Sequence, residues 1–262
     1  MIIHSAPIKQ KPRKMPPSVI QGTRILGKTG GKPALLFSSM KGIGICSVDG
    51  PLEKAIGQLA GLDPRVGTVR PQPFTVDVVS GKILHTYTEL QTHRQARERS
   101  DVRIREYTPD FEIMLIGGQR VVLEVKDPRF PCTDEYWAKV EKAKRVMFTN
   151  GYRYHVVNMK YDPGAPLVHN AGLLTALRIN FKKIITPAQV DAIEADVGDS
   201  DSTLGRVAEL AGLSLREAPI LLLQGVVAAD LSEGHLRALT PVHLAYGDLQ
   251  HLAILRFDGG EK

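Results

Sequence analysis

The stretch VRIREYTPDFEIMLIGGQRVVLEVK, residues 102–126, decides the fold. It holds two segments rich in apolar and β-branched residues, one on each side of Gly117-Gly118. Two such segments around a glycine turn are typical of a β-hairpin. We therefore predict two antiparallel strands that meet at this turn.

Three residues on this hairpin have the character of a catalytic site. Asp110 lies on the first arm, and Glu124 and Lys126 lie on the second. Residues two apart on a strand share a face, so Glu124 and Lys126 point together while Val125 points into apolar packing. Two carboxylates at a sheet edge suit Mg²⁺. A lysine beside them can orient or deprotonate a water, or stabilise charge on a phosphate. This pattern favours metal-assisted phosphodiester hydrolysis over the alternative of simple solvated strand ends.

The register of the hairpin decides whether these side chains meet. A two-residue turn at Gly117-Gly118 would pair Asp110 with Val125 and place it on the wrong face. We predict a three-residue loop, or a bulge near Pro109, because either would put Asp110 across from Glu124 or Lys126. A regular two-residue hairpin would exclude the site.

The flanking sequence predicts the other elements of this part of the chain. PLEKAIGQLAGL, residues 51–62, has helical spacing of apolar residues, with Pro51 suited to the first turn. Residues 74–79 and 82–90 are predicted as strands, and 91–100 as a polar loop. Residues 134–150 form a helix with Thr133 or Asp134 as N-cap and Gly151 after its end, and a strand follows from Tyr152.

The second part of the chain is mostly helical by its pattern. Residues 161–170, with Pro163, Gly164 and Pro166, are the predicted linker. Helices are expected over 172–181 and after Thr186, and residues 202–231 indicate a helix-turn-helix or winged-helix arrangement. We predict an α/β protein with two domains, a basic arm and mixed-sheet domain over 1–165 and a small helical domain over 166–262.

Charge is distributed unevenly between these parts. The 262 residues carry a net charge of +6, but residues 1–170 have 26 basic against 16 acidic residues and residues 171–262 have 8 against 12. Residues 1–48 contain eight Lys and Arg residues and no acidic residue. A basic segment favours a polyanionic partner such as DNA, with a merely solvated arm as the alternative.

Composition excludes several classes of protein. No apolar run approaches the roughly 20 residues of a membrane span, and the N-terminus lacks the apolar core of a signal peptide. Two cysteines provide neither a disulfide framework nor a four-cysteine zinc site. We expect a cytoplasmic protein without a membrane partner.

The order of motifs resembles the N-terminal catalytic domain of the TnsA family, the endonuclease subunits of heteromeric cut-and-paste transposases. The matching motifs cover roughly residues 35–160. They are Leu52-Glu53, Asp63-Pro64-Arg65-Val66, Gln72-Pro73-Phe74, Tyr107–Phe111 and Glu124-Val125-Lys126. The resemblance implies a restriction-endonuclease-like domain, and residues 206–232 are similar to the family's winged-helix region. Gly50 stands where the family often has serine.

The resemblance also implies roles for single residues. Glu53, Asp110 and Glu124 would bind one or two Mg²⁺ ions, for which Mn²⁺ substitutes. Val125 would add its backbone carbonyl, and Lys126 would position the attacking water. Gln72 would orient the hairpin, contact DNA or stabilise its turn. Without the resemblance, Glu53 is an ordinary first-turn glutamate that favours the helix dipole.

Basic residues are the expected DNA contacts. One set lies in the N-terminal arm and another in the polar run before the hairpin; they are Lys9, Lys11, Arg13, Lys14, Arg24, Arg97, Arg99 and Arg103.

The implied activity is cleavage of the 5′ strand at double-stranded transposon ends in the bacterial nucleoid. A transposase subunit of the DDE type would cut the 3′ ends, and an AAA+ ATPase would regulate the assembly. Two alternatives stay open at this point. One is a stand-alone restriction or repair nuclease of the same fold, and the other is a DNA-binding or assembly module without catalysis.

Overall fold

A four-stranded mixed sheet forms the centre of the computed structural model, which describes Thr23 and residues 34–42, 45–97, 101–181, 183–198 and 200–257. The strand order is β3-β7-β8-β9. Strands β3, β7 and β8 pair antiparallel, and β9 runs parallel to β8. Their bounds are Val66–Pro71, Phe111–Leu115, Arg120–Lys126 and Tyr152–Asn158. The predicted α/β class is confirmed.

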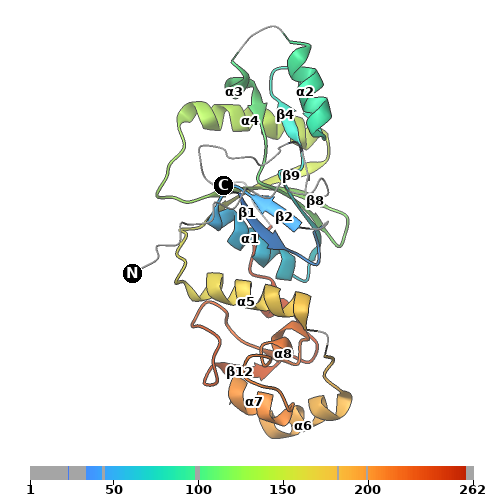
Figure 1. Ribbon diagram of the computed structural model, residues 1–262, viewed down its shortest axis with the longest axis vertical. Helices are drawn as coiled ribbons and strands as arrows, with labels where there is room; N and C mark the ends of the chain where they lie inside the picture. The colour runs from blue at the N-terminus through green and yellow to red at the C-terminus, as the bar shows by residue number, and fades with distance from the viewer. Residues whose placement is uncertain are drawn as a thin grey trace, which may run out of the picture.

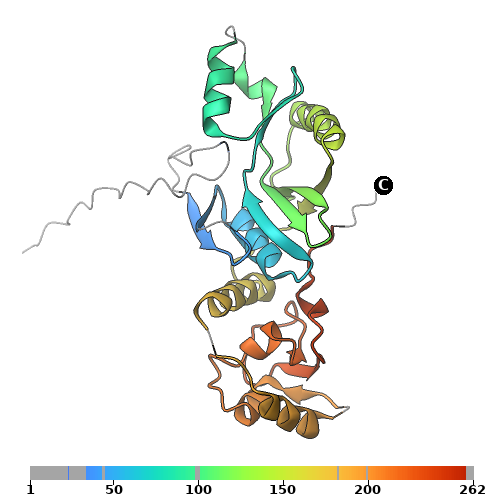
Figure 2. The same cartoon turned by 90° about the vertical axis from the view of Figure 1, so that its right-hand side faces the viewer.

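Helices cover both faces of this sheet (Figures 1 and 2). Alternate residues of β8 divide between two apolar clusters, as the two-residue period of a strand requires. Leu123 packs in the cluster that contains α1 (Pro51–Leu62), whereas Val122 packs with α4 (Asp134–Thr149). Glu124 and Lys126 share the parity of Val122, so both face α4.

Helix α1 is the best example of sequence and structure agreeing in this part. It begins at Pro51 and carries Glu53 in its first turn, as the pattern predicts. A hairpin of β1 (Leu35–Ser38) and β2 (Ile45–Val48) packs on it. At Gly57 a Cβ atom would lie 2.4 Å from the Phe37 ring, so only glycine allows this close approach.

A second, smaller sheet lies beyond the end of the central one. Its order is β5-β4-β6, with bounds Lys82–Leu84, Thr75–Asp77 and Glu106–Tyr107. Helices α2 (Tyr87–Gln95) and α3 (Val102–Arg105) accompany it, and Figure 1 shows this group at the top of the molecule.

The predictions for residues 82–105 are largely wrong. Only 82–84 of the expected strand is extended, and residues 91–95 of the expected loop belong to α2. The reason is a capping box, in which the Thr86 hydroxyl accepts from the Glu89 N–H and the Glu89 carboxylate accepts from the Thr86 N–H. Residues 102–105, expected in a strand, form α3 because Asp101 caps their first turn.

The C-terminal part contains mostly short elements. A three-stranded sheet has the order β10-β12-β11. The elements are α5 (Pro166–Asn180), α6 (Pro187–Val197), β10 (Ser202–Thr203), α7 (Leu204–Leu210), α8 (Ile220–Leu223), β11 (Val227–Ala228), β12 (Pro241–Leu244) and the 3-10 turn η2 (Gln250–Leu252). The helix after Thr186 is confirmed with Thr186 as N-cap. The expected helix over 172–181 begins earlier, at Pro166, inside the predicted linker.

Helix α5 joins the two parts rather than merely following a linker. It packs against α1, as Figures 1 and 2 show, and Arg178 donates to the carbonyl oxygen of Gly61 at 3.2 Å. The Arg65 guanidinium lies 5.0 Å from the centre of the Phe257 ring. One continuous cluster of buried residues therefore includes side chains from both sides of residue 165.

None of the helices in the described residues is both long enough and apolar enough to cross a membrane.

Candidate active site

The hairpin register brings Asp110 and Glu124 to the same face. Phe111 pairs with Leu123 and Met114 with Arg120, so the next position of this register places Asp110 opposite Glu124. Three residues, 116–118, form the loop, which is closed by a hydrogen bond from the Gly118 N–H to the Leu115 carbonyl. Gly118 has φ of 82°, which glycine adopts without strain. The predicted three-residue loop is therefore confirmed.

Asp110 is held by the backbone of the neighbouring strand. Its Oδ2 accepts a hydrogen bond of 2.7 Å from the Val125 N–H. Burial raises the pKa of Asp110 well above its usual range, and the charges of Glu124 and Glu53 raise it further. Crowding of carboxylates with too little positive charge between them is the usual electrostatic state of a site for a cation.

Glu124 is buried, at 2% exposure, and is enclosed by hydrogen-bond donors. Tyr107 donates its hydroxyl to Oε2, and Tyr136 donates its hydroxyl to Oε1. Tyr107 comes from β6 and Tyr136 from α4, so two elements beyond the hairpin fix this carboxylate. Tyr154 on β9 contacts Tyr107, with 3.3 Å between the two hydroxyl oxygens.

Lys126 completes the group around Glu124. Its ammonium forms an ion pair with Glu124 Oε1 and lies 4.6 Å from the centre of the Tyr136 ring. Burial alone lowers the pKa of Lys126, but the Glu124 carboxylate raises it, and the net shift is upward. In this arrangement the Lys126 ammonium donates to Glu124 and places a positive charge beside it.

Glu53 reaches the site from the first turn of α1. Its Oε2 accepts from the Asp49 N–H at 2.9 Å. Burial raises the pKa of Glu53 to about 7; the Asp49 N–H lowers it, whereas the negative charges of Asp49 and Glu124 raise it. The charge of Glu124 thus contributes to the raised pKa of Glu53.

Gln72 connects this helix turn to the hairpin. Its side-chain amide donates to Asp49 Oδ2 at 3.1 Å, and its backbone N–H donates to the Asp110 carbonyl oxygen at 2.8 Å. The residue is buried, with 3% exposure. It therefore touches both acidic arms of the site through different atoms.

The metal ligands expected from the resemblance are near one another but are not arranged around one point. In the ranges that the structure describes, no three His, Cys, Asp or Glu side chains are placed to hold a metal ion together. The Glu124 oxygens are taken by Tyr107, Tyr136 and Lys126 instead. Val125 is buried and supplies its N–H to Asp110.

The residues expected to bind DNA are described only in part. Lys9, Lys11, Arg13, Lys14, Arg24 and Arg99 lie outside the described residues. Arg97 forms an ion pair with the buried carboxylate of Asp77, so its charge is already compensated within the fold. Arg103 is exposed, and its carbonyl oxygen accepts from the Lys139 ammonium at 3.1 Å.

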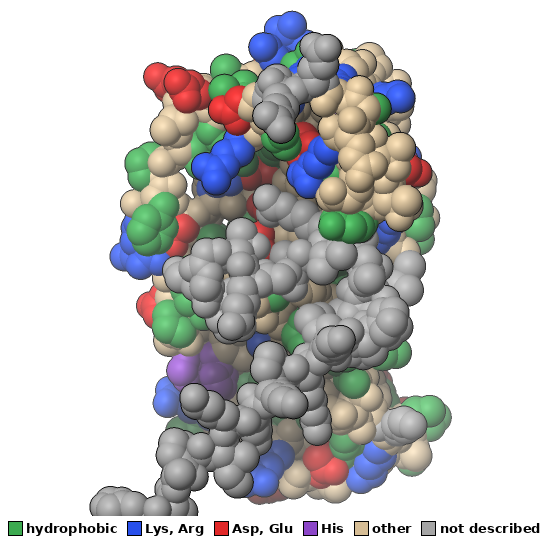
Figure 3. All heavy atoms as spheres, turned by 45° about the horizontal axis from the view of Figure 1, so that its top comes forward, with side chains coloured by type: hydrophobic (Ala, Val, Ile, Leu, Met, Phe, Trp, Pro, Cys, Tyr) green, Lys and Arg blue, Asp and Glu red, His purple; other side chains and the backbone are tan. Residues whose placement is uncertain are grey.

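The surface in this region has mixed charge. Figure 3 shows lysine and arginine side chains on the upper part of one face, with acidic side chains between them. Some of this mixing is explained by pairs such as Arg94 with Glu106. Net charge alone therefore overstates how many basic groups are available to phosphates.

Three residues around the site are missing from the sequence-based predictions. Aromatic residues at helical spacing, such as Tyr136, usually pack in a core. Tyr107 belongs to the YTPDF motif but has no acid–base pattern of its own. Asp49 precedes a helix, where acidic residues are common for electrostatic reasons. Only the capping position of Thr133 indicates that Tyr136 lies in the first turn of α4, near the end of β8.

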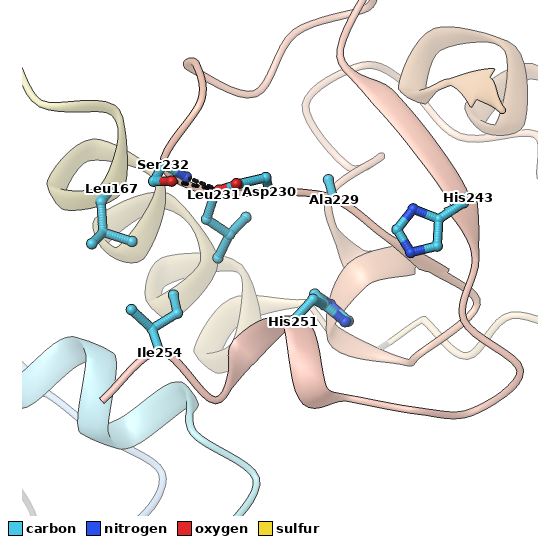
Figure 4. Close-up of a pocket in the computed structure, with 8 residues that line it drawn as sticks. All are labelled: Leu167, Ala229, Asp230, Leu231, Ser232, His243, His251 and Ile254. Carbon is cyan, nitrogen blue, oxygen red and sulfur yellow. Dashed lines mark hydrogen bonds between the residues drawn. The ribbon is translucent and has the colours of Figure 1, made fainter. Parts of the chain in front are cut away.

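A separate cavity of about 340 Å³ lies in the C-terminal part (Figure 4). Its lining residues are Leu167, Ala229, Asp230, Leu231, Ser232, His243, His251 and Ile254. The Asp230 carboxylate turns to Ser232, from which it accepts two hydrogen bonds, while His251 bonds to the Leu222 carbonyl. None of the predicted site residues lines this cavity.

Comparison of the chain with protein-family models and with curated proteins found no match in either case. The resemblance to the TnsA family therefore remains a prediction based on the motifs themselves.

Proposed function

We propose that this chain is a Mg²⁺-dependent DNA endonuclease, the transposase subunit that hydrolyses the 5′ strand at transposon ends beside a DDE-type partner. The observation that carries the proposal is the meeting of Asp110, Glu124 and Lys126 on one face of the β7–β8 hairpin. Glu53 approaches the same place from another element. These four residues are the ones that the motif order assigns to the site, and they come from α1 and from the hairpin.

The arrangement of elements supports a restriction-endonuclease-like domain with a winged-helix-like domain after it. In the first, α1 and α4 sandwich a mixed sheet whose antiparallel pair carries the acidic residues. In the second, the order α6, β10, α7, α8, β11 and β12 and the sheet order β10-β12-β11 agree with a winged helix. Helix α8 buries Ile220, Leu221 and Leu222, which favours a structural role over base reading.

The donor chemistry of the site fits a hard divalent cation. Oxygen atoms of carboxylates are the ligands that Mg²⁺ prefers. Burial and neighbouring carboxylates raise the pKa of both Asp110 and Glu53, so a cation bound between them would displace protons and stabilise the ionised carboxylates. Glu53, Asp110, Glu124 and the Val125 carbonyl are the groups that would hold the ion.

The chain's own residues account for the remaining requirements of hydrolysis. A bound divalent ion supplies Lewis acidity and a more acidic bound water. Lys126, protonated beside Glu124, donates a hydrogen bond to the attacking water or to the phosphate oxygen and stabilises its negative charge. Tyr107 and Tyr136 keep Glu124 in a fixed orientation. The products would be a 3′-hydroxyl and a 5′-phosphate.

Partners follow from the charge distribution and from the resemblance. The basic first part suits double-stranded DNA, whereas the acidic second part suits a protein surface better than phosphates. We propose the DDE-type transposase and an AAA+ ATPase as those protein partners, in the bacterial cytoplasm at the nucleoid.

The test is cleavage of end-containing DNA by the full chain with a candidate partner transposase and Mg²⁺. Lys126→Ala should abolish 5′-strand cleavage, whereas Lys142→Ala, an exposed lysine on α4, should not. Efficient cleavage without the transposase would instead identify a stand-alone nuclease. Cleavage unchanged by Lys126→Ala, or absent from the wild type, would contradict the proposal and favour a non-catalytic DNA-binding or assembly module.

A further inference from the structure

The backbone conformation and the side-chain environment of Gln72 both cost folding free energy. Its φ of 44° lies in the left-handed region, which side chains larger than Asn rarely adopt. Its Oε1 is buried without a hydrogen-bond partner. An unpartnered buried acceptor costs about 1–3 kcal/mol, and a strained backbone adds to that. Such outliers point to a function when the surrounding structure enforces them.

The surrounding structure does enforce it, through a continuous line of hydrogen bonds. The Asp49 N–H donates to Glu53 Oε2 at 2.9 Å, and the Gln72 amide donates to Asp49 Oδ2 at 3.1 Å. The Gln72 N–H donates to the Asp110 carbonyl oxygen at 2.8 Å. The line continues because the Val125 N–H donates to Asp110 Oδ2 at 2.7 Å.

This line joins α1 to the β3–β7 strand pair, with which α1 shares no backbone ladder. Glu53 belongs to α1, whereas Asp110 immediately precedes β7, whose strand partners are β3 and β8. Gln72 follows the end of β3 and is the residue that contacts both sides. The left-handed backbone of Gln72 directs its N–H to Asp110 while its side chain reaches Asp49.

We infer that Gln72 and Asp49 are a positioning pair that sets the distance between the Glu53 and Asp110 carboxylates for cation binding. The inference rests on the proposed function. Replacing a residue that hydrogen-bonds to a metal ligand and orients it typically lowers metal affinity 10- to 100-fold. A turn-stabilising role alone does not explain the choice of glutamine, because Gly or Asn would fit the left-handed backbone at lower cost.

The decisive variant is Gln72→Asn, which tolerates the left-handed backbone but is one methylene too short to reach Asp49. Binding of Mn²⁺ to the full chain, followed by the electron paramagnetic resonance of the bound ion, should weaken at least about tenfold. The melting temperature without metal should not fall. Gln95→Asn, an exposed position on α2, is the matched control and should bind Mn²⁺ as the wild type does.

Asp49 provides an independent test because it is exposed and its replacement leaves the core intact. Asp49→Asn keeps an oxygen that accepts from Gln72, so its Mn²⁺ affinity should exceed that of Asp49→Ala about tenfold. Equal losses in the two variants would make Asp49 a ligand rather than a positioning residue and would overturn the inference. Adding Gln72→Asn to Asp49→Ala should cause little further loss, because both break one line of contacts.

Cleavage kinetics separate positioning from general damage. Gln72→Asn should lower the single-turnover cleavage rate and leave DNA affinity unchanged. Wild-type Mn²⁺ binding in Gln72→Asn overturns the inference and leaves the proposed nuclease intact. Failure of the wild type itself to bind Mn²⁺ would contradict the proposed function and, with it, the inference.

Discussion

Asp77 and Asp110 are acidic residues of two neighbouring regions, and their surroundings shift their pKa values in opposite directions. Asp77, in the small sheet, is 1% exposed and meets His93 Nε2 at 2.7 Å, the Val79 N–H at 2.9 Å and the Arg97 guanidinium. Burial raises its pKa, but these donors outweigh burial and lower the pKa to about 2. At Asp110 burial and like charges raise the pKa instead.

The difference is consistent with a structural role for Asp77 and with the role in cation binding that we propose for Asp110. Asp77 is supplied with donors and opposite charge, so it stabilises the fold as an anion. Asp110 receives one backbone hydrogen bond and faces other carboxylates, so as an anion it destabilises the fold until positive charge arrives. Sites that bind cations commonly carry this cost to stability. The small sheet therefore serves as an internal reference for the candidate site.

The largest expected effect is on cleavage. Asp110→Asn should reduce cleavage of end-containing DNA by at least about a hundredfold, since it removes a charge from the cation site. Asp77→Asn should cleave at close to the wild-type rate. Single-turnover cleavage with the partner transposase measures both. Equal losses would show that the two regions do not differ in function.

The same two substitutions should move stability in opposite directions. Asp77→Asn leaves the Arg97 charge unpaired and should lower the free energy of unfolding by about 3 kcal/mol. Asp110→Asn keeps an oxygen for the Val125 N–H and removes repulsion, so the melting temperature should rise by about 2–4 °C. Thermal unfolding at pH 8 with a chelator tests this. A lower melting temperature for Asp110→Asn would show that repulsion at the site is unimportant.

The two tyrosines on Glu124 sharpen the comparison within the site. Tyr107→Phe leaves the buried Oε2 without its tyrosine donor and should lower the free energy of unfolding by about 1–3 kcal/mol. Tyr136→Phe should cost about 1 kcal/mol or less, because Lys126 still pairs with Oε1. Urea unfolding of both variants gives the values. The reverse order would place the main support of Glu124 on α4 rather than on β6.

The smallest expected effect is the loss, at low pH, of the stability that Asp77 contributes. The pKa of Asp77 is lowered from 3.8 to about 2, so its contribution to stability is complete above about pH 4 and is lost as pH falls from 4 to 2. The full contribution is about 2 kcal/mol, of which about half is lost between pH 5 and pH 3. The difference in unfolding free energy between wild type and Asp77→Asn should shrink over this window. A constant difference between pH 5 and pH 3 would argue against the charge of Asp77 as its source.

Much of the central sheet could be predicted because its pattern is local. Alternation along residues 120–126 indicates a strand with Glu124 and Lys126 on one face, and the need for Asp110 to share that face selects the three-residue loop. Helix α4 follows from its N-cap Thr133. These features depend on spacing alone.

What could not be predicted depends on contacts between distant residues. The capping box of Thr86 and Glu89 overrides a segment rich in β-branched and aromatic residues, so α2 replaces a strand. Arginine is the residue type expected to contact phosphates, but in the fold Arg97 forms an ion pair with Asp77. The hydrogen bonds that Tyr107 and Tyr136 donate to Glu124 have no sequence pattern, because they arise where β6 and α4 meet β8.

The most direct test of the central claim is a titration of the metal-free full chain with Mn²⁺, compared with Asp110→Asn. The claim predicts saturable binding by the wild type, with thermal stabilisation as binding proceeds. It also predicts at least about tenfold weaker binding by Asp110→Asn. Absence of binding by the wild type, or equal binding by both proteins, would contradict the assignment of Glu53, Asp110, Glu124 and Lys126 as a metal-dependent nuclease site.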